Sequence, residues 1–163
     1  MDGAGVRGEV LVVEDDFAIG EALRELLENE GYGVTWASNG LEALAYLRTR
    51  TPGLILLDLM MPVMDGWEFR TAQRGDPALA RVPVIVLSAD HGLERKISDL
   101  SVQAWLPKPF ALDALLAAVS QHCSRAAPGL AAAGETAAPT SPHAPRAATP
   151  RPPRTRPVGG GPP

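Results

Sequence analysis

Acidic side chains end two short apolar stretches of the chain. They are Glu14, Asp15 and Asp16 after residues 9–13, and Asp58 after residues 54–57. Carboxylates that converge repel one another, so such a cluster favours a hard divalent cation with oxygen ligands, typically Mg2+. With a cation present, one carboxylate could act as a nucleophile toward a phosphoryl group, because charge on the transferring oxygens is neutralised.

A hydroxyl and an amine end two later apolar stretches. Ser88 follows residues 84–87, and Lys108 comes shortly after residues 104–106. The hydroxyl of Ser88 offers a hydrogen-bond donor, and the ammonium of Lys108 offers a point charge for phosphate. Taken alone, an acid after a strand is more typical of a helix cap, and a lone lysine is more typical of a solvated surface. Together, the four stretch ends favour phosphoryl chemistry.

The apolar pattern predicts the elements that must position these groups. Strands are expected over residues 9–13, 34–37, 54–57, 84–87 and 104–106. Amphipathic stretches at helical spacing separate them, including a short helix over 67–73 and a weaker one over 92–100. Continuous apolar strands that alternate with helices are typical of a parallel sheet covered on both faces. The fold class predicted is α/β, a doubly wound, flavodoxin-like sheet of five parallel strands in the order 2-1-3-4-5.

This topology predicts where the chemistry would occur. Ligands of open parallel sheets bind beyond the carboxyl ends of the strands, where the strand order reverses. If the first and third strands are neighbours, the acidic run at residues 14–16 and Asp58 converge in one pocket. Pro107 is compatible with the fifth strand because that strand is expected at an edge of the sheet.

Composition divides the chain into three parts. We expect a flexible N-terminus at residues 1–8, a folded domain at 9–123 and a disordered tail at 124–163. Residues 1–123 contain 10 Lys and Arg against 18 Asp and Glu, whereas the tail has five Arg and one Glu. The tail also has ten Pro, ten Ala and five Gly but no aromatic residue. It cannot bury enough apolar surface to offset its ordering entropy, which is the basis for expecting disorder.

The same composition bears on partners and location. An acidic folded part argues against direct nucleic-acid binding through that part, since phosphate contacts need a basic surface. Cys123 is the one cysteine and cannot form an intramolecular disulfide. The N-terminus has no apolar segment typical of a signal peptide, and no run is long enough to span a membrane. We therefore expect a cytoplasmic protein with no membrane partner.

Four motifs together resemble the receiver domain of two-component response regulators. They are Val12–Asp16, the stretch Asp58–Gly66 with its pattern Asp-x-x-Met-Pro-x-Met-Asp-Gly, Leu87–Ala89 and Lys108–Phe110. The resemblance covers roughly residues 8–122, in the familiar order and spacing, and is closest to chemotaxis-receiver-like single-domain regulators. The Asp58–Gly66 pattern is highly specific, whereas the paired acids or the Lys-Pro pair alone would be weak.

The resemblance implies a phosphoacceptor with a metal site. Asp58 would accept the phosphoryl group, Asp15 would bind Mg2+ directly, and Glu14 would act through a metal-bound water. Asp58 and the backbone carbonyl of Met60 would complete the metal contacts. The remaining acid of the run, Asp16, is interpreted as the N-terminal cap of the first helix.

The resemblance also implies a switch. Ser88 would bond a phosphoryl oxygen on activation, Lys108 would pair with the phosphoryl group, and Trp105 occupies the switch aromatic position. The Lys108–Pro109 bond is expected to be cis, which only about 5–6% of X-Pro bonds are. Gly66 is expected to adopt an unusual backbone angle.

The sequence departs from the family before the switch aromatic. Members usually carry a Gly-Ala pair there, whereas this chain has Leu100–Trp105, and the segment is about two residues short. The fourth helix is therefore expected to be short, shifted or loose, which bears on the form of the output. At the rim of the pocket, Met60 and Asp90 are expected to tune hydrolysis of the phosphoryl group.

These observations favour a phosphorylation-activated response regulator. A histidine kinase or phosphotransfer protein would donate a phosphoryl group to Asp58, and output would pass by contact with an unidentified protein target. Its own catalysis would be limited to self-phosphorylation and slow autodephosphorylation. The alternative is a phosphate-independent interaction module of the same fold. A phosphohydrolase would need an acid–base aspartate two residues after the nucleophile, where Met60 cannot transfer protons.

Overall fold

The computed structural model describes residues 5–92 and 94–124. The strands are β1 (Glu9–Val13), β2 (Gly33–Ala37), β3 (Leu54–Asp58), β4 (Val84–Ser88) and β5 (Ala104–Pro107). The helices are α1 (Phe17–Asn29), α2 (Gly40–Leu47), α3 (Gly66–Gly75), α4 (Glu94–Asp99) and α5 (Leu112–His122). Strand and helix alternate from β1 to α5, as the apolar pattern predicts.

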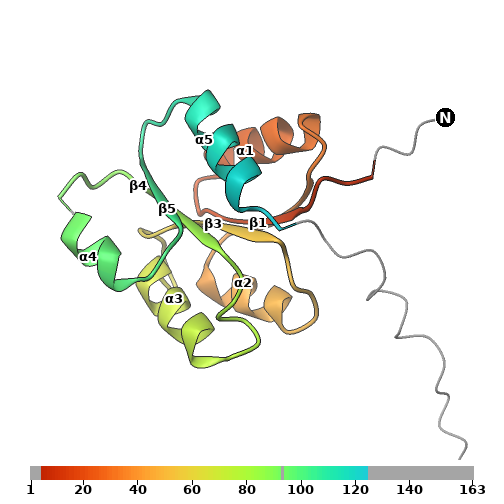
Figure 1. Cartoon of the computed structure of the whole chain (residues 1–163). Helices are drawn as coiled ribbons and strands as arrows, with labels where there is room; N and C mark the ends of the chain where they lie inside the picture. The colour runs from red at the N-terminus through yellow and green to blue at the C-terminus, as the bar shows by residue number, and fades with distance from the viewer. Residues whose placement is uncertain (1–4, 93, 125–163) are drawn as a thin grey trace, which may run out of the picture. The chain divides into compact units, whose positions relative to one another are not determined.

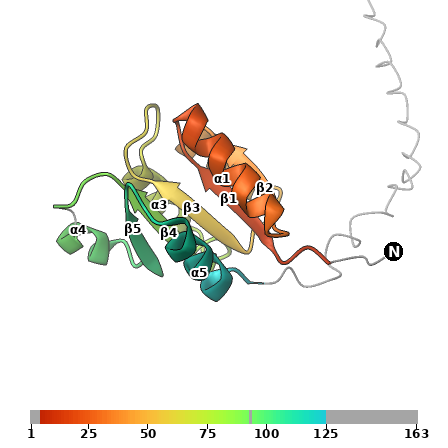
Figure 2. The same cartoon turned by 90° about the horizontal axis from the view of Figure 1, so that it is seen from above.

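The five strands form one parallel sheet in the order β2-β1-β3-β4-β5. This confirms the predicted fold class and strand order, including the contact between β1 and β3 and the edge position of β5. Helices α1 and α5 cover one face of the sheet, and α2, α3 and α4 cover the other (Figures 1 and 2). Every residue of β3 and β4 is buried, because helices cover both faces of these strands.

Two apolar clusters hold the layers together. On the face of α1 and α5, Leu23, Leu27, Leu115 and Val119 are buried against alternate residues of the central strands. The apolar cluster on the other face is larger, and within it Phe69 of α3 is fully buried. Burying a side chain of this size contributes on the order of 1.5–3 kcal/mol relative to exposure. The two clusters therefore fix the sheet whose strand ends carry the polar groups.

Polar caps begin the first three helices. The side chain of Asp16 accepts a hydrogen bond from the Ile19 amide at 3.0 Å, which confirms its role as the cap of α1. Asn39 caps α2 by accepting from the Glu42 amide at the same distance. At α3, Asp65 and Glu68 form a reciprocal capping box. Each cap contributes about 1 kcal/mol and fixes where a loop at the carboxyl edge of the sheet ends.

Helix α4 is shorter than the predicted 92–100. It spans the six residues Glu94–Asp99. It ends in a tight turn in which the Leu100 amide donates to the Ile97 carbonyl at 3.0 Å, and Ser101 then adopts a positive φ of 51°. A residue with positive φ cannot continue a right-handed helix, so the chain turns here toward β5.

Gly66 plays a different part from the one predicted. Among the glycines of the described residues, Gly31 has a positive φ, at 86°, and Gly66 does not. The expectation of an unusual backbone angle at Gly66 is therefore wrong. Gly66 instead permits a close approach, because a Cβ there would lie 2.5 Å from the carbonyl oxygen of Asp58 and 2.7 Å from the Cα of Leu59. The positive φ of this loop belongs to Val63, at 70°.

The chain ends lie largely outside this description. The predicted disorder of 124–163 falls, apart from Ser124, outside the described residues, as do residues 1–4. Within 5–8, the Arg7 amide donates to the Gly31 carbonyl and the Gly8 carbonyl accepts from the Gly33 amide, both at 2.9 Å. In the part of the chain searched, no helix has the length and apolar character needed to cross a bilayer.

Substituting Gly66 tests the close approach. We expect Gly66→Ala to lower the free energy of unfolding by roughly 1–3 kcal/mol, since the added Cβ overpacks against backbone that cannot move freely. Gly75→Ala in the same helix is the matched control, because a Cβ there meets nothing within 4 Å. Urea denaturation of both variants measures the difference, and equal stability would contradict the assigned role of Gly66.

Candidate functional site

Strand register brings the predicted groups to one edge of the sheet. Val13 of β1 pairs with Leu57 of β3, so the acids that follow each of them, Glu14 and Asp58, leave the sheet side by side. Ser88 at the end of β4 pairs with Pro107 of β5, the residue before Lys108. Four strand ends therefore deliver their polar side chains at the same level, as the topology predicts.

Three carboxylates form a cluster at this edge. One carboxylate oxygen from each of Glu14, Asp15 and Asp58 lies within 4.8 Å of the other two. Glu14 and Asp58 are buried, whereas Asp15 is exposed at the mouth of the site. An all-oxygen donor set of this kind suits Mg2+, which binds through one or two carboxylates and retains several waters. The residues present therefore fit a Mg2+ ion that enters from the Asp15 side.

Lys108 lies between the two buried acids. Its Nζ is 2.7 Å from Oε2 of Glu14 and 3.6 Å from Oδ2 of Asp58. The ammonium thus offsets part of the mutual repulsion of the carboxylates. Because Lys108 lies directly after β5, this contact also ties the edge strand to the end of β1, an interior strand of the sheet.

Burial dominates the titration of both buried acids. It raises the pKa of Glu14 to about 7, although the hydrogen bond from Lys108 opposes the shift. Burial likewise raises the pKa of Asp58, and the charge of Lys108 and the Met60 amide oppose it. The neutral forms are favoured because low-dielectric surroundings destabilise uncompensated negative charge. A cation bound to these oxygens would reverse that preference.

Backbone groups orient the two buried carboxylates. The Met60 amide donates to Oδ1 of Asp58 at 3.2 Å, and the Asp16 amide donates to Oε1 of Glu14 at 3.2 Å. The Met60 side chain is 67% exposed. The role of the Met60 carbonyl as a metal ligand stays a prediction.

Trp36 of β2, which none of the sequence motifs includes, contacts the main chain of the site. Its indole N–H donates to the Glu14 carbonyl at 2.8 Å, and its ring stacks edge-on against Phe17 with centroids 5.4 Å apart. Gly20 makes room for the ring, because a Cβ there would lie 2.6 Å from it. No signal in the sequence marks this contact, since it depends on the pairing of β1 with β2.

The switch residues lie apart in the hydrogen-bond network. Ser88 is fully buried, and its Oγ accepts from the Asp90 amide at 3.2 Å. Trp105 of β5 is half-buried against the cluster that contains Phe69 and Leu100, and its Nε1 has no hydrogen-bond partner among the described residues. No hydrogen bond of the described residues joins Ser88 to Trp105, so the switch role stays a prediction. The Lys108–Pro109 peptide bond is cis.

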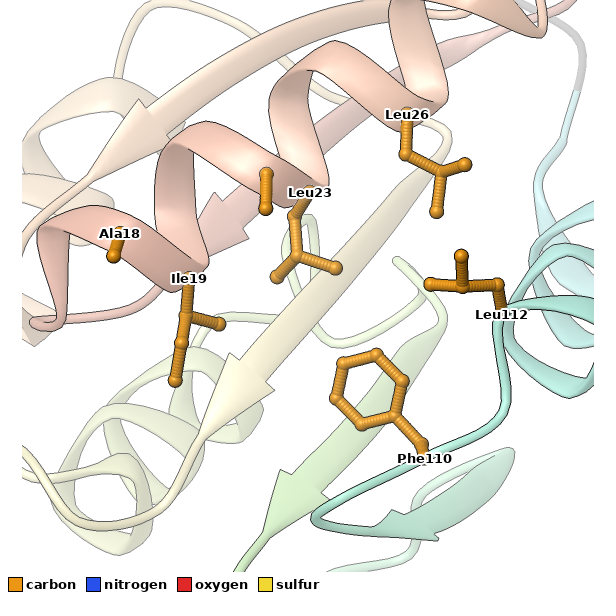
Figure 3. Close-up of a pocket in the computed structure, with 7 residues that line it drawn as sticks. Ala18, Ile19, Leu23, Leu26, Phe110 and Leu112 are labelled. Atoms are coloured by element: carbon orange, nitrogen blue, oxygen red, sulfur yellow. The ribbon is translucent and has the colours of Figure 1, made fainter.

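An apolar groove of about 300 Å³ lies between α1 and the start of α5 (Figure 3). Ile19, Leu23 and Leu26 of α1 line one side, and Phe110 and Leu112 line the other. Both walls adjoin the carboxylate cluster along the chain, because α1 follows Asp16 and Phe110 follows Lys108 by two residues. A protein that reaches Asp58 from this side would meet an apolar surface.

The fold and this set of groups define a class of protein, the receiver module of phosphoryl signalling. The sequence profile of the response regulator receiver domain matches residues 10–120. The chain therefore belongs to the response regulator receiver domain family, as the motifs predict. Members of this family are signalling modules rather than enzymes acting on a separate substrate.

Individual relatives agree with this assignment. Response regulator MprA of Mycobacterium sp. strain KMS is 39% identical over 123 residues, which cover 73% of this chain and 52% of the relative. The chain thus spans about half the length of the curated relatives that it matches. Among solved structures, the phosphorylated cyanobacterial phytochrome response regulator RcpA is 33% identical with a TM-score of 0.61, over 71% of this chain and 90% of that chain.

A second solved structure bears on the metal. The receiver domain of sensor histidine kinase PA1611 from Pseudomonas aeruginosa PAO1 is 27% identical with a TM-score of 0.66, over 71% of this chain and 97% of that one. It was solved with a magnesium ion coordinated in its active site cleft. Receiver domains thus bind Mg2+ at an acidic site, and the chain has such a cluster in Glu14, Asp15 and Asp58.

The raised pKa of Glu14 predicts how stability depends on pH without metal. Between the ordinary value of 4.5 and about 7, the folded domain holds a proton that the unfolded chain has lost. The free energy of unfolding therefore falls as pH rises through this window, by at most about 1.4 kcal/mol per pH unit from this group. Glu14→Gln removes this contribution. Urea denaturation in EDTA from pH 4.5 to 7.5 measures it.

Glu25→Gln is the control for this measurement, because Glu25 is exposed on α1. Its stability should follow the same pH dependence as the unmodified protein. Identical pH dependence of Glu14→Gln and the unmodified protein would show that Glu14 titrates normally.

Proposed function

We propose that the protein is a phosphorylation-activated response regulator that accepts a phosphoryl group on Asp58 with Mg2+ bound. The observation that carries the proposal is the convergence of Asp58 with two further carboxylates and an amine. Glu14, Asp15 and Asp58 share one cluster, and Lys108 lies 3.6 Å from Asp58. A purely structural role would not require two acids to be buried together at the end of a sheet.

The proposed reaction is a transfer between two proteins. A carboxylate oxygen of Asp58 attacks the phosphorus of a phosphohistidine, the new P–O bond forms, and the P–N bond breaks. The imidazole leaves as a neutral group once it carries a proton. Bound Mg2+ supplies charge neutralisation for the transferring oxygens. Asp15 and Asp58 would hold it directly, Glu14 would hold it through a water, and the Met60 carbonyl would complete the set.

Lys108 and Ser88 would bind the phosphoryl group once it is on Asp58. Lys108 is proposed to leave Glu14 and pair with the phosphoryl group, because a dianionic group attracts the ammonium more strongly than one carboxylate does. The Ser88 hydroxyl would then donate to a phosphoryl oxygen instead of serving only as an acceptor for the Asp90 amide. Trp105 would respond as a shift between two populated states.

The proposed donor is a histidine kinase or a phosphotransfer protein, in the cytoplasm. The apolar groove between α1 and Phe110 supports a protein donor, because its walls follow Asp16 and Lys108 closely along the chain. Output is proposed to pass to another protein through the surface of the domain itself. The excess of acidic side chains over residues 1–123 supports a protein target over nucleic acid.

Labelling with a small phosphodonor tests the chemistry without the cognate kinase. Acetyl phosphate with Mg2+ should add one phosphoryl group to the intact chain, detected by mass spectrometry, and EDTA should abolish it. Asp58→Asn should remove the modification. Asp113→Asn, which changes an exposed acid in the first turn of α5, should leave it in place.

Tryptophan fluorescence with beryllofluoride, a phosphoryl mimic, is a second test of the same site. With Mg2+, beryllofluoride should change the fluorescence in the unmodified protein but not in Asp58→Asn. Modification that does not need Mg2+, or that survives Asp58→Asn, would overturn the proposal. Absence of any modification would favour the phosphate-independent interaction module.

A further inference from the structure

Helix α3 presents two polar side chains on its core-facing side. Its buried residues are Gly66, Phe69, Arg70 and Gln73, at the spacing of one helix face. Arg70 is only 3% exposed, and Gln73 is fully buried. Apolar residues would fill these positions without a desolvation penalty, so the polar choice requires a reason.

Arg70 binds the turn after α4 with two of its three guanidinium nitrogens. Its Nε donates to the Leu100 carbonyl at 2.9 Å, and its Nη2 donates to the Ser101 carbonyl at 2.6 Å. Its Nη1 donates to Oε1 of Gln73 at 2.8 Å. Arg74, one turn later, donates to the Asp99 carbonyl at 3.0 Å. Two arginines of α3 thus cap three successive carbonyls at the carboxyl end of α4.

Gln73 anchors the arrangement from the other side. Its amide nitrogen donates to the carbonyls of Leu79 and Val82, at 3.0 and 3.3 Å, in the connection from α3 to β4. With its oxygen bound to Arg70, the Gln73 side chain is held at both ends. We call Arg70, Gln73 and Arg74, with the carbonyls of residues 99–101, the α3–α4 clamp.

The charge of Arg70 has no acidic partner. Among the described residues, the ion pairs do not include Arg70, and burial lowers the pKa of its guanidinium. Backbone carbonyls therefore compensate the cation, and they do so only while the turn after α4 keeps this position. A buried polar network that is fully satisfied in one arrangement specifies that arrangement.

The α3–α4 clamp lies between the loop that follows Asp58 and the segment that leads to Trp105. Gly66, the first residue of α3, is packed against the Asp58 carbonyl and donates its amide to the Leu59 carbonyl at 3.0 Å. At the other end, Ser101 lies four residues before Trp105. The loop after the phosphoacceptor and the segment that enters β5 are thus joined through one helix and its arginines.

We propose that the α3–α4 clamp makes the turn at residues 99–101 follow α3, so that the state of Asp58 reaches the α4–β5 surface through Arg70. This inference rests on the proposed phosphorylation of Asp58. Arg70 acts as a positioning residue, since no reacting atom touches it. A clamp that served only stability would hold the turn equally with and without a phosphoryl group.

Hydrogen exchange of the turn distinguishes these cases. In the unmodified protein, Mg2+ and beryllofluoride should change exchange of residues 98–104 several-fold, as expected for a cooperative local unit. In Arg70→Met, exchange of this segment should be several-fold faster before the mimic is added, and the response to it should be lost. Asp58 should still accept the phosphoryl group from acetyl phosphate, because the acid cluster is intact.

Matched variants keep the test decisive. Arg81→Met removes an exposed arginine just after α3 and should behave as the unmodified protein. Arg70→Lys keeps the charge but loses the planar guanidinium, and its response to the mimic should likewise be lost. It takes the place of Arg70→Met if circular dichroism shows that variant to be unfolded. Arg74→Met, which loses one carbonyl contact, should give a smaller effect.

Two results would overturn the inference. One is unchanged exchange of residues 98–104 in folded Arg70→Lys or Arg70→Met. The other is exchange in the unmodified protein that ignores the mimic although Asp58 is modified by acetyl phosphate. Failure of Asp58 to be modified at all would instead overturn the proposed function and the coupling with it, while the exchange rate without the mimic would still report whether the clamp holds the turn.

Discussion

Two carboxylates buried side by side are the constraint on which the rest of the structure depends. Glu14 and Asp58 leave neighbouring strands at the same level, and their mutual repulsion must be offset within the site. Lys108 supplies the one cation in contact with both in the described part of the chain, at 2.7 and 3.6 Å. Removing one partner of a buried ion pair typically costs about 3–5 kcal/mol. The site is therefore held by a contact that a bound cation and a phosphoryl group would both alter.

The surrounding fold keeps these charges in place with backbone contacts rather than further charges. Trp36 binds the Glu14 carbonyl, and Gly66 lets α3 approach the Asp58 carbonyl. Both contacts act on main-chain atoms, so they position the acids without changing their ionisation. The carboxylate oxygens themselves are contacted by the Asp16 and Met60 amides and by Lys108, beside the exposed Asp15. A site of this construction can exchange ligands while the sheet beneath it stays unchanged.

The sequence predicted the sheet because its strands are nearly continuous apolar runs, and it predicted the acid cluster because strand ends of a parallel sheet share an edge. It could not predict the contact of Trp36, whose acceptor is a backbone carbonyl 22 residues away, directly after the neighbouring strand β1. It also misjudged Gly66, because a close approach depends on the path of a distant segment, whereas a backbone angle is local. Arg70 escaped notice for the related reason that an arginine in a helix is usually solvated, and only the turn after α4 explains its burial.

The departures from apolar patterning cluster around the turn after α4 and at β5. Arg70 and Gln73 occupy core positions at a desolvation penalty, and the buried indole N–H of Trp105 has no hydrogen-bond partner within residues 5–92 and 94–124. An unsatisfied buried donor typically costs about 1–3 kcal/mol, so hydrogen bonding does not favour this position of the Trp105 ring. The clamp favours one position of the turn before β5, while the orphaned donor disfavours the present position of the ring. Under the proposed function, these opposed preferences on adjoining segments would help a phosphoryl group on Asp58 to shift the population between two arrangements.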